Sequence, residues 1–221
     1  IDAVETAAAV DGIERVRLGS LEPELLTGED ISRMAALPKV CPQFHLSLQS
    51  GCDATLCRMN RHYDTAEYAR IAADLRRHFP SCAITTDIMV GFPGETDVEF
   101  GESLAFAEAV GFAKAHVFAY SRRPGTRAAD MPGQIPKAVK EERSRQMIAL
   151  TSRTRAAFLQ GQIGQVVSVL FESRTPDGMY EGYAENYTPV RVGGPDNLCG
   201  QIRRVRIEAA LDGWCLGALC G

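Results

Sequence analysis

Several features that define whole classes of protein are missing from this sequence. No apolar run reaches the roughly 18 residues needed to cross a bilayer, and the 7 cysteines show no zinc-finger or zinc-ribbon spacing. The first residues, IDAVETAAAV, lack an initiator Met and the basic and apolar segments of a secretory signal. We therefore expect a cytoplasmic protein with reduced thiols, no membrane segment and no metal site of its own, cut from a longer sequence.

The composition is that of an ordinary globular protein. With 45% hydrophobic and 24% charged residues, 20 Gly and 11 Pro, the chain is not a disordered tail, a collagen or a coiled coil. The net charge of −4 is unevenly distributed, because residues 122–155 carry nine basic and three acidic side chains. The helical part of this strip predicts a solvated face, whereas Arg122, Arg123 and Arg127, in a Pro/Gly loop, predict contact with phosphate.

Apolar runs alternate with amphipathic stretches in the first half of the chain. We expect strands at 13–21, 44–50, 82–90 and 114–120, and helices at 28–37, 64–79 and 95–110. The strands begin roughly 30 residues apart, which is the length of a βαβ unit. The sequence therefore predicts an α/β fold with a parallel sheet.

The second half has a different pattern. Pro136 begins a long helix that runs to about Gln160. Short alternating runs then predict strands at 165–172, 179–185, 189–192, 201–208 and 213–219. Five short strands in this space indicate a small antiparallel barrel. We expect two domains, a parallel α/β unit over 1–150 and the small barrel over 151–221.

Polar residues follow each of the four strands expected in the first half. The motifs there are Gly19-Ser20, Gln49-Ser50, Gly91–Thr96 and Ser121–Thr126. Ligands of parallel α/β folds bind at the carboxyl ends of the strands, so these motifs predict a small-molecule site. Gly91, which lacks a side chain, would let the ligand approach the strand end closely. The alternative is that Gly91 and its neighbours only build a turn and a helix start, with Glu95 at the positive end of the helix dipole.

Two further polar residues lie inside expected strands. A buried Asp needs a partner, so Asp87 is either a satisfied structural group or a ligand contact. His45 faces no evident carboxylate, which argues against a nucleophilic pair of Cys52 and His45.

Three segments carry a family likeness. HLSLQSGCDATLCRMNRHYDTAEY (45–68), TTDIMVGFPGET (85–96) and FAYSRRPGTRAADMP (118–132) resemble the radical S-adenosylmethionine methylthiotransferases. RVRLGSLEP (15–23) fits the same alignment. Within that family, the residues after Gln49-Ser50 and the run Arg58 to Arg61 look most like the subgroup that modifies threonylcarbamoyladenosine in tRNA. The closing barrel, with GYAENY at 182–187, resembles the RNA-binding TRAM domain.

The resemblance implies a fold, cofactors and partners. The fold would be a partial radical S-adenosylmethionine (β/α) barrel without its N-terminal strands, followed by the TRAM barrel. The cofactors would be S-adenosylmethionine and, in the full-length enzyme, two [4Fe-4S] clusters whose ligands are not in this chain, because the family's Cys-x3-Cys-x2-Cys motif is absent. The partners would be tRNA and a reductant protein of the flavodoxin or ferredoxin type. The implied reaction adds a methylthio group to C2 of N6-threonylcarbamoyladenosine beside the anticodon.

The resemblance also implies roles for particular residues. Those expected at the cofactor are Gln49, Ser50, Asp87, Met89, Gly91, Glu95, Phe118 and Tyr120. Those expected at RNA are Arg122 and Arg123, joined in the barrel by Tyr187, Arg204 and Arg206. No catalytic residue and no metal ligand is assigned, and the chain alone is expected to be inactive.

Two other functions stay open at this point. The chain could be an RNA-binding module with an inactive, incomplete half barrel. It could also methylthiolate an aspartate of a ribosomal protein, although relatives of that type tend to have Gln-His where Gln49-Ser50 stands. An aldolase-like or hydrolase-like barrel would need a catalytic Lys or paired carboxylates at the strand ends, and these are lacking.

Overall fold

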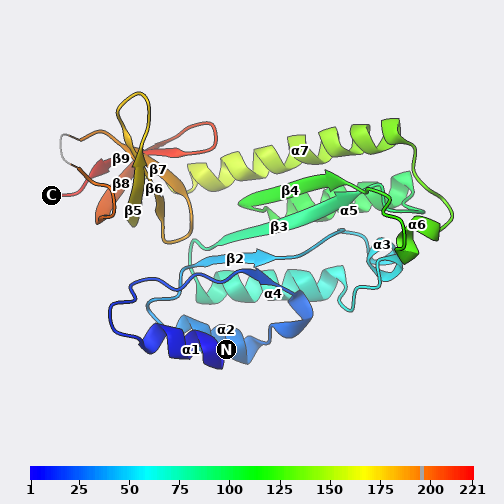
Figure 1. The fold of residues 1–221 in the computed structure, drawn as a ribbon, viewed down its shortest axis with the longest axis horizontal. Coiled ribbons are helices and arrows are strands. Elements are labelled where there is room, and N and C mark those ends of the chain that lie inside the picture. Colours follow the sequence, from blue (N-terminus) through cyan, green and yellow to red (C-terminus); the bar gives the residue numbers. More distant parts are fainter. Residues whose placement is uncertain (195–196) are drawn as a thin grey trace.

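The structure is a computed structural model that describes residues 1–194 and 197–221. Over these residues it contains a four-stranded parallel sheet and a closed five-stranded barrel, joined by one long helix (Figure 1). The predicted order, a parallel α/β unit followed by a small barrel, is confirmed. The predicted domain boundary after residue 150 falls inside the long helix and stays a prediction.

The parallel sheet has the strand order β1-β2-β3-β4. Its strands are β1 (Ser20–Leu21), β2 (Gln43–Leu46), β3 (Ala83–Val90) and β4 (Lys114–Ala119). The expected strand over 13–21 is wrong for most of its length, since before Ser20 only a bridge from Val16 to Val40 is formed. Instead, the side chain of Arg15 in this segment donates to the carbonyl of Ser168 in the small barrel at 2.7 Å.

Helical segments precede, connect and follow these strands, and the three longest pack on one face of the sheet. The helical segments are α1 (Asp2–Ala9), η1 (Pro23–Leu25), α2 (Gly28–Ala35), α3 (Asp53–Arg58), α4 (Thr65–His78), α5 (Asp97–Val110), α6 (Arg127–Asp130) and α7 (Lys137–Gln160). The sequence did not predict α1, η1, α3 or α6, but it did place the N-cap of α4 at Asp64 and the left-handed C-cap of α5 at Gly111. Within the described ranges no helix is both long enough and apolar enough to cross a membrane.

The alternation along β3 separates a packed face from an open one. Ile84, Ile88 and Val90 are buried in the core formed with α4 and α5, whereas Asp87 and Met89 are only half-buried on the opposite face. Side chains of successive strand residues point to opposite faces of a sheet. The half-buried face therefore offers polar side chains from several strands to a ligand.

The second sheet closes on itself in the order β5-β6-β7-β9-β8. Its strands are β5 (Val166–Arg174), β6 (Tyr180–Ala184), β7 (Pro189–Val192), β8 (Ile202–Ala210) and β9 (Cys215–Leu219), so all five predicted strands are present. The expectation of purely antiparallel pairing is wrong for β7 and β9, which pair in parallel. Closure brings the backbones close at Gly182, where a Cβ would lie 2.1 Å from the carbonyl oxygen of Leu170.

Candidate functional site

The carboxyl ends of β2, β3 and β4 meet at the edge of the sheet that lies away from the small barrel (Figure 1). After β2 the chain continues beside β3: the N–H of Gln49 donates to the carbonyl of Asp87 at 2.9 Å, and the N–H of Met89 donates back to Gln49 at 2.8 Å. Gln49 has a positive φ of 64° and is half-buried. A non-glycine residue held in this strained conformation is a common feature of functional sites.

The turn after Gln49 is packed against α5. Ser50 is fully buried, and its hydroxyl accepts the N–H of Cys52 at 3.3 Å. A Cβ on Gly51 would lie 2.8 Å from that of Phe106, so this position requires glycine. Burial raises the pKa of the Cys52 thiol, which disfavours the thiolate and agrees with the expectation that Cys52 is no nucleophile.

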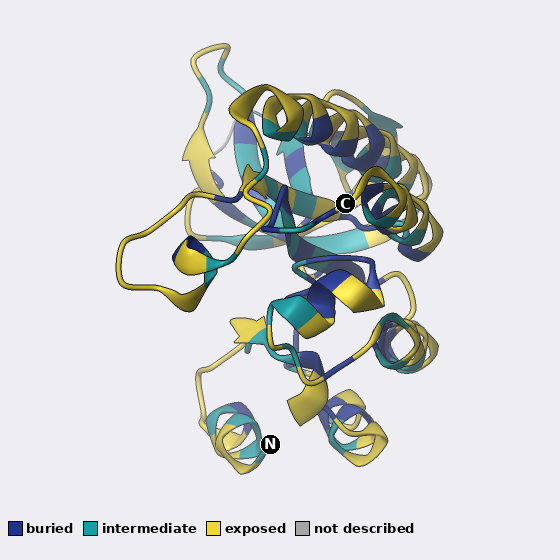
Figure 2. Cartoon of the chain, turned by 90° about the vertical axis from the view of Figure 1, so that its right-hand side faces the viewer, coloured by how far each residue is buried: buried dark blue, intermediate teal, exposed yellow. Residues whose placement is uncertain are grey.

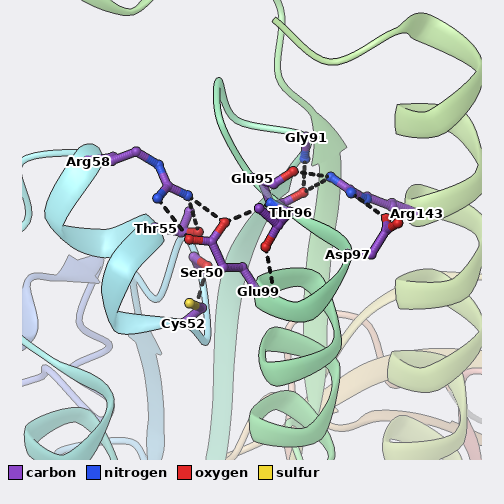
Figure 3. A network of polar contacts seen from close by, with 10 residues as sticks. All are labelled: Ser50, Cys52, Thr55, Arg58, Gly91, Glu95, Thr96, Asp97, Glu99 and Arg143. Atoms are coloured by element: carbon purple, nitrogen blue, oxygen red, sulfur yellow. Dashed lines mark hydrogen bonds and ion pairs between the residues drawn. The ribbon is translucent and has the colours of Figure 1, made fainter. Parts of the chain in front are cut away.

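A buried ion pair holds the turn after β3 (Figure 3). The carboxylate of Glu95 accepts the N–H of Gly91 at 2.7 Å and a guanidinium N–H of Arg143 at 2.7 Å. Arg143 donates in addition to the carboxylate of Asp97 at 2.7 Å. Burial raises the pKa of Glu95, while the Gly91 N–H and Arg143 oppose the shift. The Gly91 backbone is thus held by Glu95, just before α5, which is itself held by Arg143 on α7.

The expected helix start at Glu95 is wrong. Helix α5 begins at Asp97, after a capping box in which Thr96 and Glu99 bond to each other's backbone N–H. Glu95 therefore meets Arg143 rather than the end of the helix dipole. The space beside Gly91 holds the side chain of Lys140, whose Cγ would lie 2.3 Å from a Cβ at position 91. These contacts give Gly91 and Glu95 a structural role, and their contact with a cofactor stays a prediction.

Arg143 is the residue that sequence reasoning missed. It lies in the strip expected to be a solvated helix face, yet it is 5% exposed. The available signal was its spacing, since Arg143, Met147 and Leu150 form the buried stripe of α7 at i, i+4 and i+7. An arginine within such a stripe needs a buried acidic partner.

A second ion pair joins α3 to α5. Arg58 donates to both carboxylate oxygens of Glu99, each at 2.8 Å. The hydrogen bond from Arg58 holds the pKa of Glu99 below its ordinary value. Arg61 pairs with Glu22 at 3.1 Å. The two arginines of the run that resembles the threonylcarbamoyladenosine subgroup are therefore engaged in packing contacts of the protein itself.

On the open face of the sheet, His45 has the carboxylate partner that the sequence did not reveal. Its Nε2 lies 3.5 Å from Oδ2 of Asp87, and its Nδ1 lies 3.1 Å from the hydroxyl of Thr85. The expectation that His45 opposes no carboxylate is wrong, because side chains on neighbouring parallel strands meet across the same face. Asp87 is also not fully buried, since its side chain is 32% exposed.

The side chains further along this face fit one flank of a nucleoside such as S-adenosylmethionine. Met89 and Phe118 are neighbours in register on β3 and β4, and Phe118 is 40% exposed. Tyr120 is buried, and its hydroxyl has no hydrogen-bond partner within the described part of the chain. The apolar surface of Met89 and Phe118 suits a nucleobase. The cofactor role of these residues stays a prediction.

The described residues do not fit an iron–sulfur cluster. Over 1–194 and 197–221, no group of three His, Cys, Asp or Glu side chains is arranged to hold a metal ion. Cys52, Cys82 and Cys215 are buried thiols whose pKa burial raises.

The residues expected at RNA lie in two places. Arg122 and Arg123 are exposed in the loop after β4, at the edge of the sheet that faces the viewer in Figure 2. Arg204 and Arg206 are exposed on the outer face of β8, since Val205 and Ile207 between and after them are buried in the barrel. Tyr187, in the turn after β6, is 43% exposed. Their contact with RNA stays a prediction.

A four-stranded parallel sheet with helices on one face and an open polar face on the other is part of a β/α barrel. The structure is similar to coproporphyrinogen III oxidase from Escherichia coli, a Radical SAM enzyme, with a TM-score of 0.53 and 14% identity over 88% of this chain and 46% of that chain. This likeness shows the fold alone. Residues 2–107 match the family model of the Radical SAM superfamily.

Relatives found by sequence indicate a more specific class of protein than the fold does. The chain is 38% identical over 94% of its length to a tRNA-2-methylthio-N(6)-dimethylallyladenosine synthase from Moorella thermoacetica, of which it covers 47%. It is 40% identical over 99% of its length to the synthase of the same name from Maricaulis maris, of which it covers 48%. The chain thus contains a segment that matches the Radical SAM superfamily model and is similar to tRNA methylthio synthases along nearly its whole length, and it spans about half the length of these relatives.

Proposed function

We propose that this chain is part of a radical S-adenosylmethionine methylthiotransferase that modifies an N6-substituted adenosine in tRNA. The observation that carries the proposal is the similarity to tRNA methylthio synthases along nearly the whole chain, at 38% and 40% identity. The open sheet face with its strained Gln49 and half-buried Asp87 supports it from the structure. S-Adenosylmethionine, when bound with a reduced cluster, supplies the radical chemistry.

In this proposal the chain positions the cofactor and the substrate. Met89 and Phe118 supply the apolar contact for the adenine, the Gln49 amide supplies a polar contact to the nucleoside, and Tyr120 packs beneath this face. The pair of Glu95 and Arg143 keeps the Gly91 turn in place. The two [4Fe-4S] clusters and a flavodoxin-type or ferredoxin-type reductant would be supplied from outside these residues.

The RNA would contact both ends of the molecule. Arg122 and Arg123 would bind phosphate beside the cofactor end, and the TRAM-like barrel, as a second domain over 151–221, would contribute Arg204 and Arg206. Phosphate contacts by arginine fix the position of an RNA without reading its sequence. The adenosine must leave its stack to reach a site within the protein.

Two modified adenosines are candidates for the substrate. The run from Arg58 to Arg61 resembles the threonylcarbamoyladenosine subgroup, but Arg58 and Arg61 are held by Glu99 and Glu22 and need not touch the substrate. The relatives above are named for dimethylallyladenosine. We therefore favour the dimethylallyl nucleoside and keep the threonylcarbamoyl nucleoside as the alternative.

Nucleoside analysis tests the proposal. The complete gene product that contains these residues is expressed in a bacterium that lacks its own tRNA methylthiotransferases, and digested tRNA is examined by mass spectrometry. We expect the methylthio form of dimethylallyladenosine, its loss in an Asp87→Asn/Phe118→Ala variant, and its retention in Arg145→Ala, an exposed control. The methylthio form of threonylcarbamoyladenosine would identify the alternative substrate, and the absence of both nucleosides would contradict the proposal.

A further inference from the structure

A pocket of 230 Å³ lies on the open face of the sheet, away from the Gly91 turn. It is lined by residues of β2, β3 and β4, by the segment 17–20 and by Tyr187 in the turn between β6 and β7. The side chains that give it its chemistry are Arg17, His45, Thr85, Lys114, His116 and Tyr187. Because a strand rises about 3.3 Å per residue, Thr85 in this pocket lies roughly 20 Å along β3 from Gly91.

The lining of the pocket is cationic. Among the described residues, none of those that line it is acidic. Arg17 and Lys114 are exposed, and neither takes part in the ion pairs found within the described ranges. The carboxylate next to the pocket is Asp87, and it faces His45 at 3.5 Å. Two free cations beside imidazole and hydroxyl donors suit an anion.

Arg17 is held in place by aromatic stacking. Its guanidinium carbon lies 4.2 Å from the ring centroid of Tyr187. The same ring also stacks on Tyr183, with centroids 4.3 Å apart and planes inclined by 11°. Tyr187 is therefore engaged by two side chains within the protein itself. The stack fixes the guanidinium at the mouth of the pocket while its N–H groups stay available.

The turn that carries Tyr187 is anchored to the rest of the molecule. The buried side chain of Asn186 donates to the carbonyl of Ser81, just before β3, and to the side-chain oxygen of Gln162, just after α7, each at 3.0 Å. Tyr187 itself has a φ of 62°. Left-handed backbone in a bulky residue is strained and persists only where the surroundings enforce it, which is typical of binding sites.

We propose that this pocket binds a phosphate group, with Arg17 and Lys114 as the charged contacts and His116 and Thr85 as further donors. An RNA backbone phosphodiester is the ligand, an assignment that rests on the proposed function. Free phosphate has the same recognition chemistry. Tyr187 acts as a positioning residue for Arg17.

RNA binding tests the source of the phosphate. The 221-residue chain is titrated against a fluorescent anticodon stem-loop RNA at several salt concentrations. We expect Arg17→Ala/Lys114→Ala to bind roughly tenfold more weakly, with a salt slope smaller by about two. The control is Lys137→Ala/Arg145→Ala, which removes one exposed Lys and one exposed Arg from α7 and should change neither quantity. Thermal unfolding establishes that both variants are folded.

Inorganic phosphate tests the pocket independently of RNA. We expect phosphate to shift the imidazole NMR signals of His45 and His116, assigned through His45→Gln and His116→Gln, and not those of His62 and His78. If the wild type binds RNA and the Arg17→Ala/Lys114→Ala variant keeps the same RNA affinity and salt slope, the phosphate-site proposal is wrong and the proposed function stands. If RNA does not bind but phosphate shifts these signals, the pocket stands and the RNA function fails. If neither ligand binds, the inference is overturned.

Discussion

Replacing Arg143 by methionine tests whether the buried ion pair holds the strand end in place. Arg143→Met keeps much of the side-chain volume but removes the charge that faces Glu95. The two side chains are 6% and 2% exposed. In the variant, Glu95 keeps the Gly91 N–H at 2.7 Å as its polar contact and loses both bonds from Arg143, at 3.0 Å to its carbonyl and 2.7 Å to its carboxylate.

The magnitude follows from burial. Removing one partner of a buried ion pair costs about 3–5 kcal/mol, because the remaining charge is left without compensation. We expect about 3 kcal/mol, since the Gly91 N–H still stabilises the carboxylate. Glu95→Gln in the Arg143→Met background removes the stranded charge, and it should recover a large part of the lost free energy of unfolding.

The pH dependence gives a second signature. Burial raises the pKa of Glu95 above its ordinary value of 4.5, and without Arg143 the shift becomes larger. A raised pKa in the folded state gives stability that is present below the unfolded pKa and is lost as the pH rises through the folded pKa. The deficit of Arg143→Met should therefore be largest at neutral pH and shrink on acidification toward pH 4.5.

Urea unfolding followed by circular dichroism measures these differences. The control is Arg145→Ala, whose side chain is 75% exposed and which should change the free energy of unfolding by less than about 0.5 kcal/mol. A loss below about 1 kcal/mol for Arg143→Met, or a deficit independent of pH, would refute the buried pair as the support of the Gly91 turn.

Three other predictions follow from the same contacts. Glu99→Gln should lower the free energy of unfolding by about 1–2 kcal/mol at pH 7; because Arg58 lowers the pKa of Glu99, the difference from wild type should vanish as the pH falls through that pKa, and a constant difference in urea titrations would contradict this. Arg122→Glu/Arg123→Glu should weaken stem-loop RNA binding and reduce the salt slope by about two with unchanged S-adenosylmethionine affinity by calorimetry; an unchanged slope would remove this loop from the RNA interface. Anaerobic reconstitution of the 221-residue chain should yield no stoichiometric [4Fe-4S] cluster by iron and sulfide assay, and a bound cluster would reveal a ligand set that its cysteines do not suggest.

The periodic parts of the fold were predictable from sequence. β3, α4 and the five barrel strands follow from local alternation, capping and turn residues. The edge strand was not predicted correctly. Residues 13–19 alternate like a strand, yet Arg15 in this segment is hydrogen-bonded to the small barrel. A hydrogen bond between residues 153 positions apart in sequence leaves no local signal.

The candidate site was predictable in its location but not in its internal contacts. Polar strand ends identified the edge of the sheet, because parallel strands bring their carboxyl ends together. The partner of Glu95 lies 48 residues away on α7, and the partner of His45 lies across the sheet on β3. Such pairs depend on register and helix rotation, which composition and spacing do not determine.

Helix α7 connects the two ends of the molecule at which RNA contact is proposed. Arg143 anchors it to the turn after β3, and Arg155, about 18 Å further along at 1.5 Å per residue, donates to the carbonyl of Gly213 in the small barrel at 2.6 Å. Because one continuous helix makes both contacts, the phosphate pocket keeps a fixed distance from the strand ends. Under the proposed function, an RNA held by the pocket and by the Arg122 loop is oriented across the open face, so that a base released from its stack faces Asp87 and Phe118.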